Sequence, residues 1–263
     1  MSIPQIHRKF IKARSFIFDV DGTITPSRGK INKHFHRWLD DFSSREKIYF
    51  VTGSDKPKTV EQIGDYLYHQ CKAVYQCGGA EKWIGDTVVE TSDWKISDEL
   101  KYALELELSK SGFPLRTGNH IEERSGLCNF SILGRNATLA ERILYETYDE
   151  VHNERFQIAK RLSEYSDYDF KVAGATGIDI TPKGVNKSQI LKDFVMDQAD
   201  NTQHENCGTP DCCQQCDDIY FFGDMVQPGG NDHEIYEAIK KSSNGKVYGV
   251  KDWEETWKIL KTL

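Results

Sequence analysis

Short apolar runs alternate with helically spaced hydrophobic residues in the first third of this chain. Residues 15–18, 47–51 and 73–75 form three such runs, and each has the length and character of a buried strand. Between them, helical spacing joins two groups: Phe35, Trp38, Leu39 and Phe42, and then Val60, Ile63 and Leu67. Strands that alternate with helices in this order are typical of a parallel sheet covered on both faces.

The middle of the chain has a different pattern. Gly85-Asp86 and Ser125-Gly126 each separate two apolar segments, which predicts two hairpins. Hydrophobic residues within 97–110 follow helical spacing, and Thr138 to Glu141 has the form of a capping box that opens another helix. Hairpins mixed with helices predict an α+β insertion into the first pattern.

Alternation of strands and helices resumes near the end of the chain. The elements predicted there are a helix at 187–197, a strand at 219–222, a helix at 233–240, a strand at 247–250 and a helix at 254–260. We therefore predict an α/β fold. Its Rossmann-like parallel-sheet core comprises residues 1–89 and 182–263, and an inserted α+β cap domain comprises residues 90–181.

Composition excludes several classes of protein. The 263 residues are 38% hydrophobic and 29% charged, which is enough to bury a core and excludes a disordered chain. The net charge of −7 argues against general nucleic-acid binding. No apolar run approaches the roughly 20 residues that span a bilayer, and the first residues do not resemble a signal peptide. We expect a cytoplasmic protein that does not bind membranes.

Two carboxylates directly follow the first predicted strand, in Asp19-Val20-Asp21-Gly22-Thr23. Ligands of open parallel sheets bind beyond the carboxyl ends of the strands. Two carboxylates at this spacing can divide a reaction, since one can attack as a nucleophile while the other gives and takes a proton.

Other polar residues lie where they can reach the same crevice. Thr52 follows the second strand, Lys187 follows the insertion, and Gly223-Asp224 and Asn231-Asp232 follow the strand at 219–222. A group of carboxylates without Cys or His favours a hard cation such as Mg²⁺. Carboxylates, a hydroxyl group, a lysine and Mg²⁺ together are suited to phosphoryl transfer.

These four motifs together resemble those of the haloacid dehalogenase superfamily, and more closely those of the eukaryotic-type phosphomannomutase family. The segments that carry the resemblance are Phe18 to Pro26 (FDVDGTITP), Gly53-Ser54-Asp55 and Phe221 to Ile235 (FFGDMVQPGGNDHEI), with Ile121 to Gly126 and Ile132 to Arg135 in the cap. The resemblance extends from about Arg14 to Val250. It implies a Mg²⁺-dependent enzyme that acts on hexose phosphates through a hexose bisphosphate.

The resemblance also implies roles for single residues. Asp19 would be the nucleophile that forms an aspartyl-phosphate, and Asp21 the general acid and base. The phosphoryl group would be hydrogen-bonded by Thr52 or Ser54 and neutralised by Lys187. The residues expected to hold Mg²⁺ are Asp19, Asp224 and the backbone carbonyl of Asp21, with Asp232 or Asn231 nearby.

Cap residues complete the expected substrate site. Arg124, Arg135 and Arg142 match arginines that hold the distal phosphate of the substrate, and Asp179 matches an aspartate that contacts the sugar. The chain departs from the family at Gly177, where a serine is usual, so one sugar-contacting hydroxyl is missing or is replaced by Thr176. We also expect a homodimer formed through the cap.

A polar, cysteine-rich segment lies between the helix after Lys187 and the strand before Asp224. His204, Cys207, Cys213 and Cys216 form two chelating pairs, which is a recognised zinc geometry. Cys212 could replace Cys213, and the alternatives are free thiols or a redox pair. The resemblance offers no such site, so structural Zn²⁺ is a hypothesis from spacing alone.

Three functions compete at this point. The first is a phosphomannomutase-like mutase that interconverts mannose 6-phosphate and mannose 1-phosphate. The second is a Mg²⁺-dependent sugar-phosphate phosphatase of the same superfamily. The segment 179–187 resembles such phosphatases more closely than the mutases, and Thr52 stands where the mutases usually have glycine. The third, a non-catalytic binding protein, is disfavoured because the carboxylates of both motifs are intact.

Overall fold

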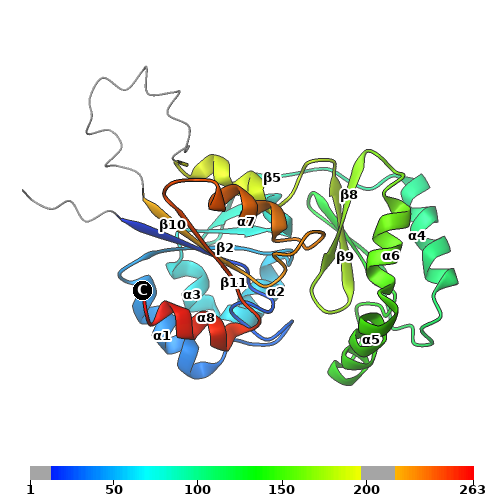
Figure 1. The fold of residues 1–263 in the computed structure, drawn as a ribbon, viewed down its shortest axis with the longest axis horizontal. Helices are drawn as coiled ribbons and strands as arrows, with labels where there is room; N and C mark the ends of the chain where they lie inside the picture. The colour runs from blue at the N-terminus through cyan, green and yellow to red at the C-terminus, as the bar shows by residue number, and fades with distance from the viewer. Residues whose placement is uncertain (1–12, 197–216) are drawn as a thin grey trace, which may run out of the picture.

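Two β-sheets organise the residues that the computed structural model describes, which are 13–196 and 217–263 (Figure 1). The larger sheet has seven strands in the order β11-β10-β1-β2-β3-β4-β5. These strands are β1 (Arg14–Phe18), β2 (Lys47–Val51), β3 (Ala73–Gln76), β4 (Glu81–Ile84), β5 (Thr87–Thr91), β10 (Asp218–Gly223) and β11 (Gly245–Gly249). The first five strands of that order are parallel, and β4 and β5 extend the sheet as an antiparallel hairpin.

Helices cover both faces of this sheet because alternate residues of its strands point to opposite sides. Phe16 and Phe18 pack with α1 (Lys33–Ser43), α3 (Asp65–Gln70) and α8 (Trp253–Leu260). Ile17, between them, belongs to a second cluster with α7 (His233–Lys240) and the 3₁₀ helix η2 (Lys187–Asp193). The predicted α/β class with a parallel-sheet core is therefore confirmed.

The smaller sheet is antiparallel, with four strands in the order β6-β7-β9-β8. Its strands are β6 (Ile121–Arg124), β7 (Leu127–Phe130), β8 (Tyr168–Ala173) and β9 (Gly177–Pro182). Its helices are α4 (Asp98–Lys110), α5 (Leu139–His152) and α6 (Glu154–Leu162). They pack on the face that is turned away from the larger sheet, so the other face is directed toward it (Figure 1).

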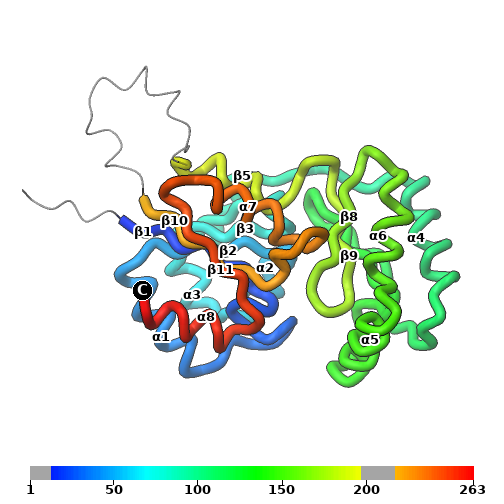
Figure 2. Tube along the Cα trace, viewed as in Figure 1, coloured from blue at the N-terminus to red at the C-terminus, as the bar shows by residue number. Residues whose placement is uncertain are grey.

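The chain crosses between the two sheets twice (Figure 2). The first crossing follows Thr91, the last residue of β5, and the return follows Pro182, the last residue of β9. The expected first boundary at residue 90 thus falls inside β5. The part built on the larger sheet and the part built on the smaller sheet have separate buried clusters, and we call them the core and the cap below.

Three local features of the structure differ from what the sequence pattern predicts. The helix predicted over 187–197 is the 3₁₀ helix η2, whose period of three places Lys187 and Ile190 on the same buried side, and it ends at Asp193. The helix predicted around Val60 to Leu67 is divided at Gly64 (φ 83°) into α2 (Lys56–Ile63) and α3. Helix α6 was not predicted. The proposed zinc residues His204, Cys207, Cys213 and Cys216 lie outside the described residues.

Several contacts join the cap to the core. The backbone N–H of Val172 donates to the carbonyl of Gly229 (3.2 Å), and Lys171 Nζ lies 2.5 Å from Glu234 Oε1. These contacts fix β8 against the segment that precedes α7 and against the first turn of α7. They therefore hold one face of the smaller sheet over the carboxyl ends of the parallel strands.

Within the described residues, no helix combines the length and the apolar character that crossing a membrane requires.

Glu107 joins two helices of the cap. Its carboxylate is 4% exposed and accepts hydrogen bonds from Arg161 of α6 (2.5 and 3.1 Å) and from Lys110 (3.0 Å). Burial acts to raise the pKa of Glu107, but these two cations outweigh it, and the pKa lies below its ordinary value.

We predict that Glu107→Gln lowers the free energy of unfolding by about 1 kcal/mol at neutral pH, because both cations are half exposed and screened. A carboxylate with a lowered folded-state pKa stabilises the fold above its unfolded pKa, and this contribution is lost as the pH falls through the folded pKa. The difference between wild type and variant should therefore vanish in acid. Denaturant unfolding across pH measures it, with the exposed Glu105→Gln as control. An equal effect of both variants would contradict the prediction.

Candidate active site

Three sequence motifs meet at the carboxyl edge of the parallel strands. Asp19 follows β1, Thr52 follows β2, and Gly223-Asp224 ends and follows β10. The register pairs Phe18 with both Phe222 and Phe50, so the three strands end at the same level. Residues far apart in the sequence are thereby brought to one edge, as the order of the motifs predicted.

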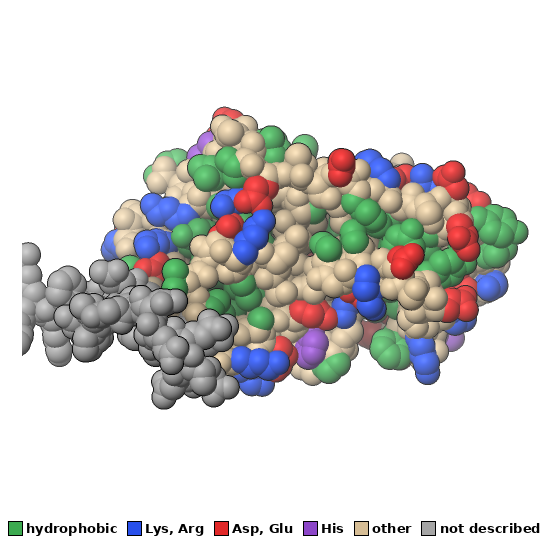
Figure 3. Space-filling model, turned by 90° about the horizontal axis from the view of Figure 1, so that it is seen from above, with side chains coloured by type: hydrophobic (Ala, Val, Ile, Leu, Met, Phe, Trp, Pro, Cys, Tyr) green, Lys and Arg blue, Asp and Glu red, His purple; other side chains and the backbone are tan. Residues whose placement is uncertain are grey.

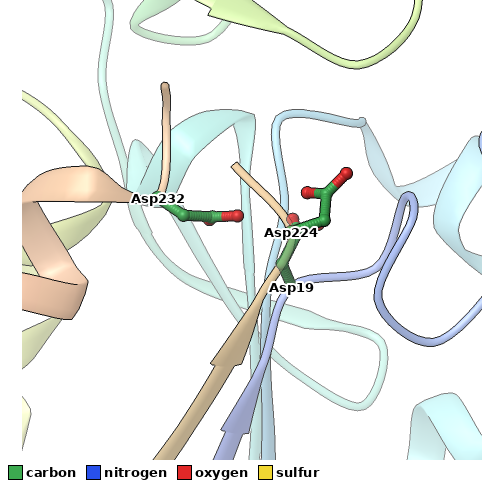
Figure 4. A group of neighbouring side chains, drawn as sticks. All are labelled: Asp19, Asp224 and Asp232. Atoms are coloured by element: carbon green, nitrogen blue, oxygen red, sulfur yellow. The ribbon is translucent and has the colours of Figure 1, made fainter. Parts of the chain in front are cut away.

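Carboxylates of Asp19, Asp224 and Asp232 offer oxygen atoms that lie within 4.8 Å of one another. Asp232 reaches from the start of α7 toward the other two, which stand at the ends of neighbouring strands (Figure 4). Lys187 Nζ donates to Asp19 Oδ1 (2.5 Å) and to Asp232 Oδ1 (2.7 Å). Both of these ion pairs are buried, with side chains no more than 6% exposed.

The single ammonium group of Lys187 does not balance the charge of the three carboxylates, so the cluster has excess negative charge. Burial raises the pKa of Asp19 to about 7; repulsion from Asp232 and Asp21 adds to this, while Lys187 opposes it. Burial and repulsion from Asp19 and Asp232 raise the pKa of Asp224 well above its ordinary value. Burial acts against the charge of Lys187, but Asp19 and Asp232 outweigh it and raise its pKa. A divalent cation bound by oxygen ligands would compensate the excess charge, so the residues present fit such an ion.

Gly22 allows this close approach. Its backbone has φ 82°, a conformation that other residues rarely adopt. A β-carbon at this position would overlap Asp224 Oδ2. The glycine of the first motif is therefore needed twice, for the turn and for the space that Asp224 occupies.

Asp21 lies beside the cluster but faces a different set of groups. Its Oδ1 accepts from Gln62 Nε2 (2.9 Å) and from the backbone N–H of Arg28, and its Oδ2 accepts from Ser54 Oγ (3.4 Å). The side chain is half-buried and lines the same pocket as Asp19. It can therefore exchange a proton with a ligand that Asp19 contacts, which is the role predicted for it.

Thr52 and Ser54 differ in what their hydroxyl groups contact. Thr52 is 1% exposed, and its Oγ1 accepts from the backbone N–H of Ser54 (3.1 Å). Ser54 Oγ donates to Asp21. Both residues line the pocket, so either hydroxyl could bind a phosphoryl oxygen there. The prediction that Thr52 or Ser54 binds the phosphoryl group therefore keeps both alternatives.

The pocket that contains Asp19 has walls from the core and from the cap. The core contributes the carboxylates Asp19, Asp21 and Asp224, and the cap contributes the guanidinium groups of Arg124 and Arg135. Arg28, from the core loop after the first motif, also lines this pocket. The pocket therefore has an acidic side at the strand ends and a basic side beneath the cap.

Neighbouring groups fix the cap arginines. Glu122 Oε2 accepts from Arg124 Nη2 (2.8 Å) and lies 2.5 Å from Arg135 Nε, and Arg124 also donates to the carbonyl of Gly53 in the core. Burial and the charges of Arg124 and Arg28 lower the pKa of Arg135 to about 10, against the opposing charge of Glu122. Positive charge is thus in excess here, and an anion would be favoured.

Arg142 and Asp179, the remaining predicted substrate residues, occupy different positions. Arg142 is buried and donates to Thr176 Oγ1 (3.1 Å) and to the carbonyl of Arg135 (3.0 Å), so its guanidinium braces the wall that Arg135 and Thr176 form. Asp179 is buried on β9 and lines the pocket. Burial raises its pKa, although Asn129 and Arg124 oppose this.

Sequence reasoning missed Arg28, Glu122 and Asn129. Arg28 lies in the loop that begins with the first motif, and a cation so close in sequence to Asp19 and Asp21 was a usable signal. Glu122 lies within the resembling segment Ile121 to Gly126 but was assigned no role there, and Asn129 gave no comparable signal, because its contacts come from the pairing of β7 with β9.

Known proteins resemble this chain over most of its length. The family model described as eukaryotic phosphomannomutase matches residues 35–263. A phosphomannomutase of Saccharomyces cerevisiae is 30% identical and covers 100% of this chain and 99% of its own. One from Encephalitozoon cuniculi is 31% identical, covering 84% of this chain and 83% of its own.

Solved structures share the fold at low identity. The C-terminal domain of Candida albicans trehalose-6-phosphate phosphatase has a TM-score of 0.63 at 18% identity, covering 95% of this chain and 92% of its own. A haloacid dehalogenase-like hydrolase from Bacteroides thetaiotaomicron has a TM-score of 0.53 at 13% identity, covering 95% and 99%. These neighbours establish only the fold, whereas the family model and the full-length relatives establish descent: the chain belongs to the eukaryotic phosphomannomutase family.

Proposed function

We propose that this protein is a Mg²⁺-dependent hexose-phosphate mutase that interconverts mannose 6-phosphate and mannose 1-phosphate. The observation that carries the proposal is the pocket with an acidic side at Asp19 and a basic side at Arg124 and Arg135. A mutase must hold two phosphates of one bisphosphate at once, one at the reacting group and one at a distance. Family membership supports the same activity.

Asp19 is the proposed nucleophile and Asp21 the proposed proton carrier. In the first half-reaction a hydroxyl of the hexose phosphate attacks the phosphorus of the aspartyl-phosphate, the bond to Asp19 breaks, and Asp21 takes the hydroxyl proton. The product is a hexose bisphosphate. In the second half-reaction, Asp19 attacks the other phosphorus and Asp21 returns the proton to the departing sugar oxygen. Atoms and charge balance over the cycle, and the aspartyl-phosphate is regenerated.

The acidic cluster is the proposed Mg²⁺ site. Asp19, Asp224 and Asp232 would hold the ion, with the backbone carbonyl of Asp21 as a further oxygen ligand. Bound Mg²⁺ would neutralise charge on the transferring phosphoryl oxygens. Lys187 supports the same role from the protein side, since its ammonium group is buried against Asp19.

The distal phosphate is the proposed ligand of the basic side. Guanidinium groups match phosphate oxygens in geometry and stay charged at neutral pH. The cap that carries Arg124 and Arg135 also closes over Asp19, and this would exclude the water that otherwise hydrolyses an aspartyl-phosphate.

A sugar-phosphate phosphatase is the second candidate. It would need only the acidic side of the pocket, with water in place of a second sugar hydroxyl. The observation that favours it is Gly177, which lines the pocket without a side-chain hydroxyl. Parallel measurement of isomerisation and phosphate release separates the two functions.

A homodimer formed through the cap remains part of the proposal. Large hydrophobic side chains on α4 and α5 are exposed, namely Tyr102, Leu139, Ile143, Leu144 and Val151. On the face drawn in Figure 3, hydrophobic groups are interspersed with charged ones at the end opposite the grey segment. The molar mass in solution tests this.

We predict opposite effects of Asp224→Asn with and without Mg²⁺. Without the ion, the variant should melt at a higher temperature than wild type, because one of three mutually repelling carboxylates is removed. In millimolar Mg²⁺, the free energy of unfolding of wild type should rise by about 2.7 kcal/mol at a concentration 100 times the dissociation constant. The free energy of unfolding of Asp224→Asn should rise less. Thermal melting measures both effects, with KCl of equal ionic strength and the exposed Asp93→Asn as controls. Equal Mg²⁺ stabilisation of Asp224→Asn would contradict this site.

We predict that Asp19→Asn abolishes turnover while the fold is retained, because an amide cannot form an acyl-phosphate. Asp21→Asn should lose about 10²–10⁴-fold, the usual contribution of general acid–base catalysis. The assay contains mannose 1-phosphate, Mg²⁺ and catalytic hexose 1,6-bisphosphate, and it follows both the isomer and free phosphate. Near-wild-type activity of Asp19→Asn would exclude the mechanism.

We predict that Arg135→Ala weakens binding of hexose phosphates about 10–100-fold, since the loss of hydrogen bonds to a charged group costs about 1.5–3 kcal/mol. It should also raise phosphate release relative to isomerisation, because the distal phosphate is held less firmly. Arg37→Ala, on the exposed side of α1, serves as control. If wild type releases only phosphate even with the bisphosphate present, the phosphatase function replaces the mutase.

A further inference from the structure

Asn129 uses both ends of its side-chain amide to connect a cation with an anion. It lies on β7, is 5% exposed and lines the pocket. Its Oδ1 accepts from Arg135 Nη1 (2.9 Å), and its Nδ2 donates to Asp179 Oδ1 (2.7 Å). Neither the proposed reaction nor the sequence motifs assign this residue a role.

The amide satisfies both neighbours because it carries a donor and an acceptor on one side chain. A carboxylate would accept from Arg135 but would repel Asp179, and an apolar side chain would remove one hydrogen bond from each of these two charged groups. Strand register explains the arrangement, since Asn129 is paired with Asp179 across β7 and β9. The amide is therefore built into the cap wall by the backbone.

Gly177 provides the space that this amide occupies. It lies on β9 two residues before Asp179, and therefore on the same face of the strand. A β-carbon at position 177 would lie 2.6 Å from Asn129 Nδ2, which is closer than carbon and nitrogen atoms can approach. Any side chain there must displace the amide, and the backbone angles of Gly177 do not themselves require glycine.

We propose that Asn129 is a positioning residue that orients Arg135 and Asp179 toward the sugar phosphate, and that Gly177 is the residue that permits it. The inference rests on the proposed hexose-phosphate substrate and adds to it a specificity element of the cap. In this chain the amide of Asn129 occupies space that a larger residue at 177 would otherwise fill. The sugar-facing wall therefore depends on this pair of residues.

A double-mutant cycle tests the coupling. Asn129→Ala removes the amide, and Gly177→Ala displaces it, so each should raise KM for mannose 1-phosphate about tenfold or more while changing kcat less. In the Asn129→Ala background, Gly177→Ala should add little, because no amide remains to be displaced. The double variant is thus expected to match Asn129→Ala alone.

Two controls separate positioning from loss of the fold. Hydrolysis of p-nitrophenyl phosphate would use only the acidic side of the pocket, so all three variants should lose much less of this activity than of their affinity for mannose 1-phosphate. Cys128→Ala alters the neighbouring residue of β7, which is buried in the hydrophobic cluster of the cap, and should leave KM for mannose 1-phosphate unchanged.

The outcomes distinguish this inference from the proposed function. Additive effects on KM, or an equal loss of p-nitrophenyl phosphate hydrolysis, would overturn the positioning role. If wild type hydrolyses mannose 1-phosphate without isomerising it, the mutase proposal fails. The KM values of the double-mutant cycle are then measured from phosphate release. Non-additive effects on KM would still support the positioning role of Asn129, and additive effects would still refute it.

Discussion

The ammonium group of Lys187, buried between Asp19 and Asp232, is the interaction on which the arrangement of the active site depends. Three carboxylates at the ends of β1 and β10 and at the start of α7 would repel one another in a buried environment. Removing one partner of such a buried network typically costs several kcal/mol, because an uncompensated charge remains. Lys187 is also the first residue of η2, which directly follows the return of the chain from the cap. The same residue thus ties the two halves of the core together at these buried carboxylates.

Charge is divided across the pocket in a way that neither half of the molecule could provide alone. The core supplies a cluster with too few cations, and the cap supplies arginines with too few anions. A ligand with phosphates at both ends and Mg²⁺ at one of them would compensate both imbalances. Contacts from Val172 to Gly229 and from Lys171 to Glu234 hold the two sides at this separation. The unequal charges are therefore brought to opposite sides of one pocket by the contacts between the core and the cap.

Polar groups within the cap wall restrict how its cations can turn. Glu122 bridges Arg124 and Arg135, and Asn129 bridges Arg135 and Asp179. Guanidinium groups with fixed orientations lose less conformational freedom when they bind phosphate than free ones would. Gly177 leaves the space that the amide of Asn129 occupies, since a β-carbon at position 177 would lie 2.6 Å from Asn129 Nδ2.

The sequence by itself determined the order of the strands and the polar residues that stand at the strand ends. Asp19, Thr52 and Asp224 each follow an apolar run, and parallel strands must end at a common edge, so their meeting could be predicted. Periodicity could not distinguish the 3₁₀ helix η2 from an α-helix, because both place Lys187 and Ile190 on one side over a single turn.

Only the tertiary structure decided the contents of the cap wall. Arg28, Glu122 and Asn129 become significant through the pairing of β6, β7 and β9 and through the closure of the cap over the core. The physical reason is that a motif adjacent to a strand end is positioned by local chain geometry, which the sequence specifies. A contact between two strands or two domains depends on register and on closure, which are fixed by packing across the whole molecule.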